Sequence, residues 1–185
     1  MFNQDSALTI ARVDDPHTPG KKLEELRRYS LEDDSYTVIS SQEKDGFRRS
    51  EDACSFYGDQ MAILEGDTLY VYDLGTQEKR EIITMASIQN YWIADGKVFF
   101  AVKDTPEGMS SPLLRLYYVA LEGGTPTRLK NNGETLSVYF HIFGESTSFF
   151  VGQVLDDNFL SHEYIIPKAD YYTDNFTILQ PWPPA

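Results

Sequence analysis

Apolar and polar residues alternate along most of this chain in short runs separated by turn-forming residues, which is the pattern of antiparallel β-strands. The clearest feature is a hairpin that recurs three times, with a Leu at the end of its first strand and an aliphatic residue at a constant spacing in its second. The paired anchors are Leu31 and Ile39, Leu74 and Ile82, and Leu121 and Leu129. Because a period of about 40 to 50 residues is typical of propellers, this repeat predicts stacked β-sheets.

Two further strands are predicted upstream of the hairpin in the second, third and fourth units. They cover residues 53–57 and 60–64, 89–94 and 97–102, and 136–143 and 147–155. In the third unit Asp95-Gly96 separates the two strands, and this dipeptide indicates a hairpin because Gly readily adopts the positive φ of a type I′ turn. Each of these units is therefore predicted to be a four-stranded antiparallel sheet.

The first unit is predicted to lack an innermost strand, because the chain opens in what resembles a second strand, Ala7–Val13. In the same unit Pro19–Arg28 carries Leu23 and Leu26 at helical spacing, so a helical turn is an alternative there. We favour a strand, since the segment is short and aligns with strands of the other units.

The fourth unit repeats the hairpin less regularly, with strands predicted at Tyr164–Ala169 and Asn175–Leu179. Pro167 places the first of these strands at a sheet edge or at a bulge, because proline cannot donate to a ladder. The carboxyl-terminal residues Gln180–Ala185 are too few and too rich in proline to supply the strand that the first unit lacks.

These elements predict an all-β chain, a β-propeller-like array of about four antiparallel four-stranded blades in a single domain of 185 residues. The units cover about residues 1–45, 50–86, 87–131 and 134–180. Closed propellers have about four to eight complete blades, whereas this chain has about four units and the first is predicted to lack a strand. We therefore expect an array that is partial or open, or that pairs with another copy. Its terminal edges would then be exposed, and exposed edges invite self-association.

Composition supports the β-rich interpretation and narrows the range of partners. Aromatic residues make up 14% of the chain, and they suit half-buried pleated surfaces. The formal net charge of -13 repels phosphate groups, so we expect no nucleic-acid binding and no docking on anionic membranes. No apolar run approaches the ~18 residues of a membrane-spanning helix, so no membrane insertion is expected, and no secretory signal is visible. The compartment stays open, and the cell envelope is a candidate if the chain is a piece of a longer protein.

No catalytic, cofactor-binding or metal-ligating residue is predicted. His17, His141 and His162 lie in different units without metal-ligand spacing, so they are expected to be packed or hydrogen-bonded. Cys54 is the only cysteine, which excludes an intramolecular disulfide, and we expect it to be buried. No serine lies in a Gly-x-Ser-x-Gly elbow, so nucleophilic catalysis has no support in the sequence.

Acidic clusters and glycine pairs are interpreted as turn residues. The acidic clusters, Asp14-Asp15, Glu32–Asp34 and Asp156-Asp157, lack the alternate spacing of calcium ligands. Gly123-Gly124 and Asn131–Gly133 lack the strand-to-helix context of a phosphate site.

One loop is a candidate for ligand binding. Lys103–Pro112 extends the turn between the second and third strands of the third unit beyond the roughly two to five residues usual for a hairpin. Long loops on a rigid scaffold are where binding residues concentrate. A neutral insertion is the alternative interpretation.

Three segments resemble the repeats of bacterial TolB-like and related β-propellers: Leu69–Thr76, Ala94–Phe100 and Leu116–Gly124. They combine an Asp-Gly-Lys turn before an apolar strand with a strand of Tyr and alternating apolar residues that runs into a turn. The resemblance covers the second and third units, and the last two strands of the first and fourth. It implies propeller blades and carries no catalytic residue.

Hypotheses from three classes of function follow from this architecture. The leading hypothesis is a non-enzymatic propeller-type scaffold or binding module that engages a protein or a small ligand through its loops. The alternative is the propeller portion of a larger enzyme, a hydrolase or lyase whose catalytic residues are not identifiable here. A third hypothesis is a purely structural repeat of an envelope or cell surface.

Overall fold

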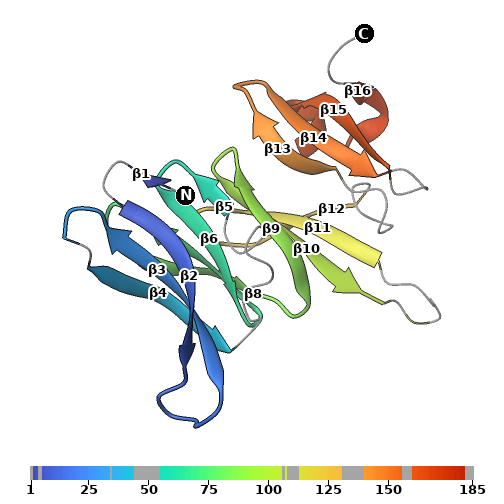
Figure 1. Cartoon of the computed structure of the whole chain (residues 1–185). Coiled ribbons are helices and arrows are strands. Elements are labelled where there is room, and N and C mark those ends of the chain that lie inside the picture. Colours follow the sequence, from blue (N-terminus) through green and yellow to red (C-terminus); the bar gives the residue numbers. More distant parts are fainter. Residues whose placement is uncertain are drawn as a thin grey trace. The chain divides into compact units, whose positions relative to one another are not determined.

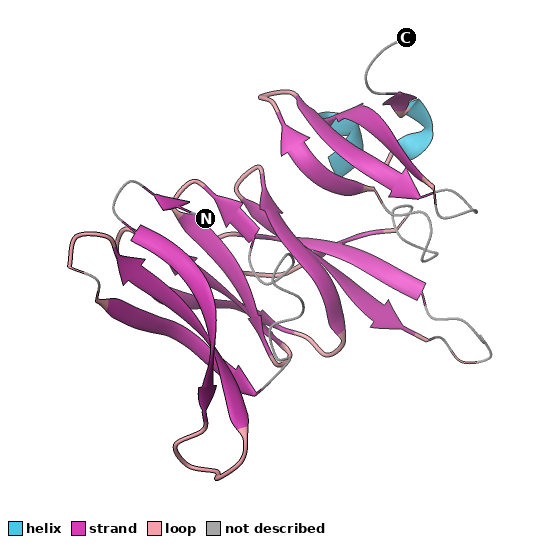
Figure 2. Cartoon of the chain, viewed as in Figure 1, coloured by secondary structure: helices cyan, strands magenta, loops and turns pink. Residues whose placement is uncertain are grey.

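The computed structural model describes residues 2–3, 6–33, 35–43, 55–105, 107, 113–130, 140–155 and 160–181. Strands make up most of this part of the chain, and its two short helices lie near the carboxyl end (Figure 2). The chain divides into two compact units. The amino-terminal unit holds residues 1–53 and 64–66, and the main unit holds residues 54–63 and 67–185.

The amino-terminal unit contains the first sheet, which is antiparallel. Its strands, in spatial order, are β1 (Phe2–Asn3), β2 (Ser6–Asp14), β3 (Lys22–Ser30) and β4 (Tyr36–Glu43) (Figure 1). Because β3 covers the segment with helical spacing, the strand interpretation is confirmed and the helical alternative is wrong. β1 pairs Phe2 with Ala7, so the prediction that this unit lacks an innermost strand is wrong. Two residues are too few to show an alternating pattern, which explains the error.

The main unit contains three more antiparallel sheets, each with four strands in chain order (Figure 1). The second sheet comprises β5 (Ser55–Tyr57), β6 (Gln60–Glu65), β7 (Thr68–Asp73) and β8 (Lys79–Thr84), and all of it except Leu64 and Glu65 belongs to the main unit. The third comprises β9 (Ile88–Ala94), β10 (Lys97–Asp104), β11 (Leu113–Ala120) and β12 (Thr127–Leu129). The fourth comprises β13 (His141–Glu145), β14 (Phe149–Leu155), β15 (Ser161–Pro167) and β16 (Gln180–Pro181). The predicted array of about four four-stranded antiparallel sheets is confirmed.

The three recurring hairpins and the Asp95-Gly96 turn form where the sequence predicted them. The three recurring hairpins are the pairs β3–β4, β7–β8 and β11–β12. Between β9 and β10, Asp95 has a φ of 49° and Gly96 a φ of 64°, and a type I′ turn requires positive φ at both central positions. Lys97 then pairs with Ala94, so the turn fixes the register of the two strands.

The end of the fourth sheet differs from the prediction. Residues 175–179, predicted as a strand, contain the 3-10 helix η1 (Phe176–Ile178), and the helix α1 (Lys168–Tyr172) precedes it. The outer strand is instead β16, which pairs with β15. Pro167 is the last residue of β15, and its φ of −58° is compatible with the start of a helix. α1 is held in place by Tyr171, which is fully buried, and an isolated sequence pattern does not reveal such tertiary packing.

The core of the main unit lies between the third and fourth sheets. Its large side chains are Trp92, Phe99, Leu114, Leu116 and Leu129 from the third sheet and Phe140, Ile142, Phe150, Ile166 and Tyr171 from the fourth sheet and its flanking segments. The innermost strands also follow one another, since β5 contacts β9 and β9 contacts β13. The three sheets of this unit therefore pack in succession.

Several positions named in the sequence analysis lie outside the described residues. They are Asp34, Cys54, Pro106, Gly108–Pro112, Asn131–Gly133 and Asp156-Asp157. The expectation that Cys54 is buried therefore stays a prediction. Lys103 and Asp104, assigned to the long loop from the sequence, belong to β10, so the connection to β11 is shorter than predicted.

Candidate functional site

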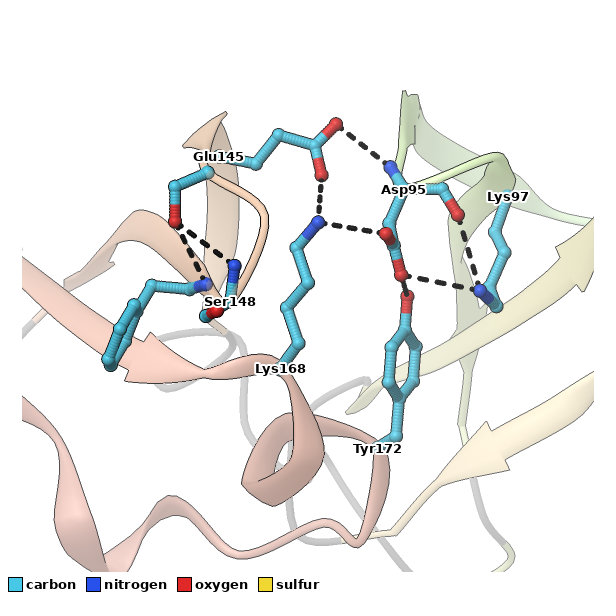
Figure 3. Close-up of polar contacts among 8 residues, drawn as sticks. Asp95, Lys97, Glu145, Ser148, Lys168 and Tyr172 are labelled. Atoms are coloured by element: carbon cyan, nitrogen blue, oxygen red, sulfur yellow. Dashed lines mark hydrogen bonds and ion pairs between the residues drawn. The ribbon is translucent and has the colours of Figure 1, made fainter.

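A cluster of charged side chains joins the third sheet to the fourth (Figure 3). Asp95 lies in the turn between β9 and β10, and Lys97 is the first residue of β10. Glu145 ends β13, and Lys168 and Tyr172 are the first and last residues of α1. We call these five residues the inter-sheet clasp.

Lys168 connects the two carboxylates of the clasp. Its Nζ donates to Asp95 Oδ1 at 2.8 Å and to Glu145 Oε2 at 2.6 Å. Only 14% of the Lys168 side chain is exposed, against 29% for Asp95 and 23% for Glu145. Because these pairs are largely shielded from water, we expect them to stabilise the fold more than an exposed ion pair does.

Asp95 is the most densely bonded residue of the clasp. The Tyr172 hydroxyl donates to Asp95 Oδ2 at 2.6 Å, and Lys97 Nζ lies 3.4 Å from the same oxygen. Lys97 Nζ also donates to the Asp95 carbonyl oxygen at 3.2 Å. The Asp95 N–H in turn donates to Glu145 Oε1 at 3.0 Å. Backbone and side chain of this one turn residue are therefore both tied to the fourth sheet.

Aromatic rings connect the clasp to the hydrophobic core. Lys97 Nζ lies 4.7 Å from the centre of the Tyr172 ring, and Lys168 Nζ lies 5.0 Å from the centre of the Phe150 ring. Both distances suit a cation–π interaction. The Tyr172 ring also packs against Phe150 and Tyr118, with centroids 5.8 and 5.3 Å apart. Polar clasp and apolar core thus form one continuous interface.

The turn between β13 and β14 positions the start of α1. Ser146 Oγ accepts the N–H groups of Ser148 at 3.3 Å and Phe149 at 3.1 Å, a local arrangement that serine favours in turns. The Lys168 N–H then donates to the Ser148 carbonyl at 2.9 Å. These bonds hold the backbone of Lys168 beside Glu145 and so direct its side chain into the clasp (Figure 3).

Burial and hydrogen bonding act in opposite directions on the charged groups. Burial raises the pKa of Asp95, but the hydrogen bonds from Lys168 and Tyr172 outweigh it and leave this pKa below its ordinary value. Burial lowers the pKa of Lys168, while the bonds to Asp95 and Glu145 raise it by more. The pKa of Tyr172 is raised by burial and by its bond to Asp95. At neutral pH Asp95 is therefore ionised, Lys168 is protonated and Tyr172 is neutral.

The charged groups of the clasp balance one another. Its two carboxylates face two ammonium groups, and the Tyr172 hydroxyl donates to one of those carboxylates. Such an arrangement holds two sheets in one relative position, because each bond spans the third and fourth sheets or braces a residue that does. The clasp therefore fixes the fourth sheet against the third.

Two smaller contacts join the second sheet to the third. Arg80 of β8 donates from Nη2 to the Leu121 carbonyl at 2.8 Å. Gly123, with a φ of 90°, lies so close to β8 that a Cβ there would be 3.6 Å from the Ile82 carbonyl oxygen. The turn after β11 thus packs directly on the neighbouring outer strand.

The three histidines that the sequence singled out lie in different parts of the structure. His17 is exposed in the connection between β2 and β3, where its backbone N–H donates to Asp15 Oδ1 at 2.8 Å. His141 is half-buried, with its ring edge-on to Trp92 at a centroid distance of 4.8 Å, and His162 is exposed in β15. Among the described residues, no group of three His, Cys, Asp or Glu side chains could hold a metal ion. In the same part of the chain, no helix has the length and apolar character needed to span a bilayer.

Sequence reasoning recognised Asp95 only as a turn residue and missed Glu145, Lys168 and Tyr172. Asp95 lies 50 positions from Glu145 and 77 from Tyr172, so no local motif connects them. The Asp-Gly turn was the one available signal, because it indicates a turn that presents an aspartate side chain.

Four-stranded antiparallel sheets in chain order, packed in succession with their innermost strands in contact, define a β-propeller-like protein. Neither protein-family models nor curated proteins match the chain. Solved structures do match. The acylaminoacyl peptidase of Pyrococcus horikoshii has a TM-score of 0.59 at 11% identity, and the match covers 89% of this chain and 29% of that chain.

Two further structures have lower TM-scores. The β-propeller domain of the Trilobed protease from Pyrococcus furiosus has a TM-score of 0.37 at 9% identity, covering 91% of this chain and 70% of that chain. The N-terminal domain of Nup159 has a TM-score of 0.42 at 15% identity, covering 88% of this chain and 45% of that chain. At 11% identity the match to the peptidase shows similarity of fold alone, and this chain spans less than a third of the peptidase.

Proposed function

We propose that this chain is a non-enzymatic propeller-type scaffold that binds a protein or a small ligand through its loops. The observation that carries the proposal is the inter-sheet clasp, which together with the aromatic core fixes the third sheet against the fourth. A rigid framework lowers the entropic cost of binding because the loops that it carries are already positioned. Resemblance to bacterial TolB-like repeats supports the same proposal at the level of the blades.

The connection from β10 to β11 is the loop that we expect to contribute most to binding. It follows Asp104 and ends before Leu113, so it is long for a connection between paired strands. Its base is braced by an ion pair between Asp104 and Arg115. A braced base presents the loop from a fixed position on the third sheet.

The test replaces residues 105–112 with an Asn-Gly turn and compares partner capture by quantitative mass spectrometry. The matched control replaces residues 16–20, in the connection between β2 and β3, with the same turn. We expect the first replacement to remove a partner or ligand that the control retains, with an unchanged thermal unfolding midpoint in both. Equal capture by both variants would contradict loop-mediated binding and favour a purely structural repeat.

A second candidate function is the propeller portion of a larger enzyme, a hydrolase or lyase. It is favoured by the match to the acylaminoacyl peptidase, of which this chain spans only 29%. The test measures hydrolysis of peptide substrates by the full-length protein and by variants His141→Ala, His162→Ala and Cys54→Ala. Turnover that survives all three substitutions would count heavily against chemistry carried by this chain, whereas loss of turnover in one correctly folded variant would support it.

A further inference from the structure

The outer strand of the first sheet differs from the outer strands of the other sheets. β4 is eight residues long, and no described strand pairs with its outer side. Its residues 36–42 include neither a charged residue nor a proline. By contrast, β8 begins Lys-Arg-Glu, β12 has only three residues, and β16 has two and ends at Pro181. Charge, shortness and proline are features that protect sheet edges from further pairing, and residues 36–42 of β4 have none of them, since the one charged residue of this strand is Glu43 at its end.

The backbone of β4 presents hydrogen-bonding groups on its open side. The Ser30 N–H donates to the Ser35 carbonyl at 2.9 Å, so these two residues form a hydrogen-bonded pair. Bonded and non-bonded pairs alternate along an antiparallel ladder. Tyr36, opposite Tyr29, and Val38, opposite Arg27, are then the non-bonded positions, and their N–H and C=O groups face the open side.

The side chains at these two positions form an exposed apolar platform. Tyr36 is 48% exposed and Val38 is 41% exposed. On the same face the Tyr29 ring lies 5.3 Å from the Tyr36 ring, and the Arg27 guanidinium lies 4.1 Å above the Tyr36 ring. Cross-strand pairs with aromatic and β-branched residues stabilise added strands, so a strand laid beside β4 would gain contacts here.

The second half of β4 is held in place by residues of its own unit. Gln42 Nε2 donates to the Leu64 carbonyl at 2.9 Å, and the Ser40 hydroxyl bonds to the Glu65 carboxylate. The strand is therefore ordered before any partner arrives, which reduces the entropy lost on binding.

We propose that β4 binds an extended segment of a partner protein as an added strand of the first sheet. This inference rests on the proposed role as a binding scaffold and adds a second surface to its loops. The segment carries apolar side chains at alternate positions, facing Tyr36 and Val38, and a basic residue at the end beside the acidic turn that contains Glu32 and Asp33. Backbone bonds supply affinity in such additions, and the alternating side chains supply specificity.

Charge favours a different protein over a second copy of this chain. Each chain has a formal net charge of -13, so two copies repel one another. Antiparallel pairing of β4 with itself would also bring the turn of Glu32 and Asp33 in one copy near Glu43 of the other. Lys21 binds Glu43 at 3.0 Å and offsets that carboxylate only in part, since both side chains are largely exposed.

The test uses a display library of short random peptides, selected on the full chain. We expect the enriched peptides to alternate apolar and polar residues and to carry a basic residue near one end. A synthetic enriched peptide should bind Val38→Pro at least tenfold more weakly, because proline removes an outward N–H without removing a ladder bond to β3. The matched control Val38→Thr keeps that N–H and should retain most of the binding.

Amide hydrogen exchange on the unmodified chain tests the same contact independently of whether Val38→Pro folds. Peptide binding should slow exchange at Tyr36 and Val38. Enriched peptides that leave both amides unprotected would overturn the inference while leaving the proposed loop-mediated function intact. A library that yields no binder would also overturn the inference. The same holds if sedimentation shows that the unmodified chain is a dimer and that Val38→Pro dissociates it. Loss of capture in the loop replacement described above tests the proposed function separately.

Discussion

Asp95 shows how much a single residue contributes to joining the two sheets. Its φ of 49° belongs to a region that aspartate tolerates better than most residues, so it can occupy the tight turn. In that turn its carboxylate reaches Lys168 and Tyr172, and its N–H reaches Glu145. Asp95 thus adopts the backbone conformation that the hairpin turn requires and also forms the bonds that join the third sheet to the fourth.

Substitution Asp95→Asn is expected to change how stability depends on pH. Because the folded state lowers the pKa of Asp95, its ionisation stabilises the protein above the ordinary value of 3.8, and this stabilisation is lost as the pH falls through the folded pKa. The variant should therefore be less stable than the unmodified protein at neutral pH. The difference should shrink as the pH falls from about 5 to about 2 in urea unfolding experiments. Asp59→Asn, at an exposed turn residue, is the control, and an equal effect there would contradict the prediction.

Gly152 of β14 is constrained by space and not by backbone conformation. A Cβ at this position would lie 2.5 Å from the His141 carbonyl oxygen and 2.5 Å from the Phe140 ring. Gly152→Ala is therefore expected to lower the free energy of unfolding by about 1–3 kcal/mol, measured by chemical denaturation. The control is Gly144→Ala, where the nearest atom, Val151 Cβ, would be at an ordinary 3.7 Å. Similar losses in both variants would show that the close approach is not the cause.

At the scale of elements, α1 replaces the regular hairpin in the fourth sheet. The helix is only five residues long, and such a short helix is not stable by propensity alone. Tyr171 stabilises it, because this side chain is fully buried among the rings of Phe99, Phe140 and Phe150. Because α1 is anchored in this way, the side chains of Lys168 and Tyr172 reach Asp95.

Tyr171→Ala is expected to remove this anchor. The substitution should lower the free energy of unfolding by about 3–5 kcal/mol, because it removes a large aromatic side chain from a packed site and leaves a cavity. Tyr172→Phe, which keeps the ring and removes only the hydroxyl that binds Asp95, should cost about 1.5–3 kcal/mol. Urea unfolding monitored by fluorescence gives both values. A smaller loss for Tyr171→Ala than for Tyr172→Phe would contradict the role assigned to Tyr171.

At the scale of the whole molecule, apolar burial is distributed unevenly. Among the described residues, the first sheet has Ala7 and Leu26 as its buried hydrophobic side chains, whereas the main unit has an extended aromatic core. Regions with few buried apolar contacts open more readily than a packed core. We therefore expect the two units to respond differently to a core substitution.

Phe150→Ala is expected to weaken the third and fourth sheets together. Phe150 lies in β14 and packs edge-on against Phe99 of β10, with centroids 6.2 Å apart. Hydrogen–deuterium exchange should therefore accelerate in β10 and β11 as well as in β14 and β15, with little change in β2 and β3. Phe149→Ala is the matched control, because that neighbouring side chain is 40% exposed. Acceleration confined to the fourth sheet would show that the two sheets do not unfold as one unit.

The sequence by itself determined most of the strands, although not β1 or β16, because alternation and turn residues act over a few positions. It revealed the repeat, the Asp95-Gly96 turn and the four-sheet architecture. It did not determine β1, whose two residues show no pattern, or α1, which depends on burying Tyr171. Only the tertiary structure decided that Asp95, Glu145 and Lys168 meet. Their interaction depends on how whole sheets pack, and no local spacing in the chain encodes that packing.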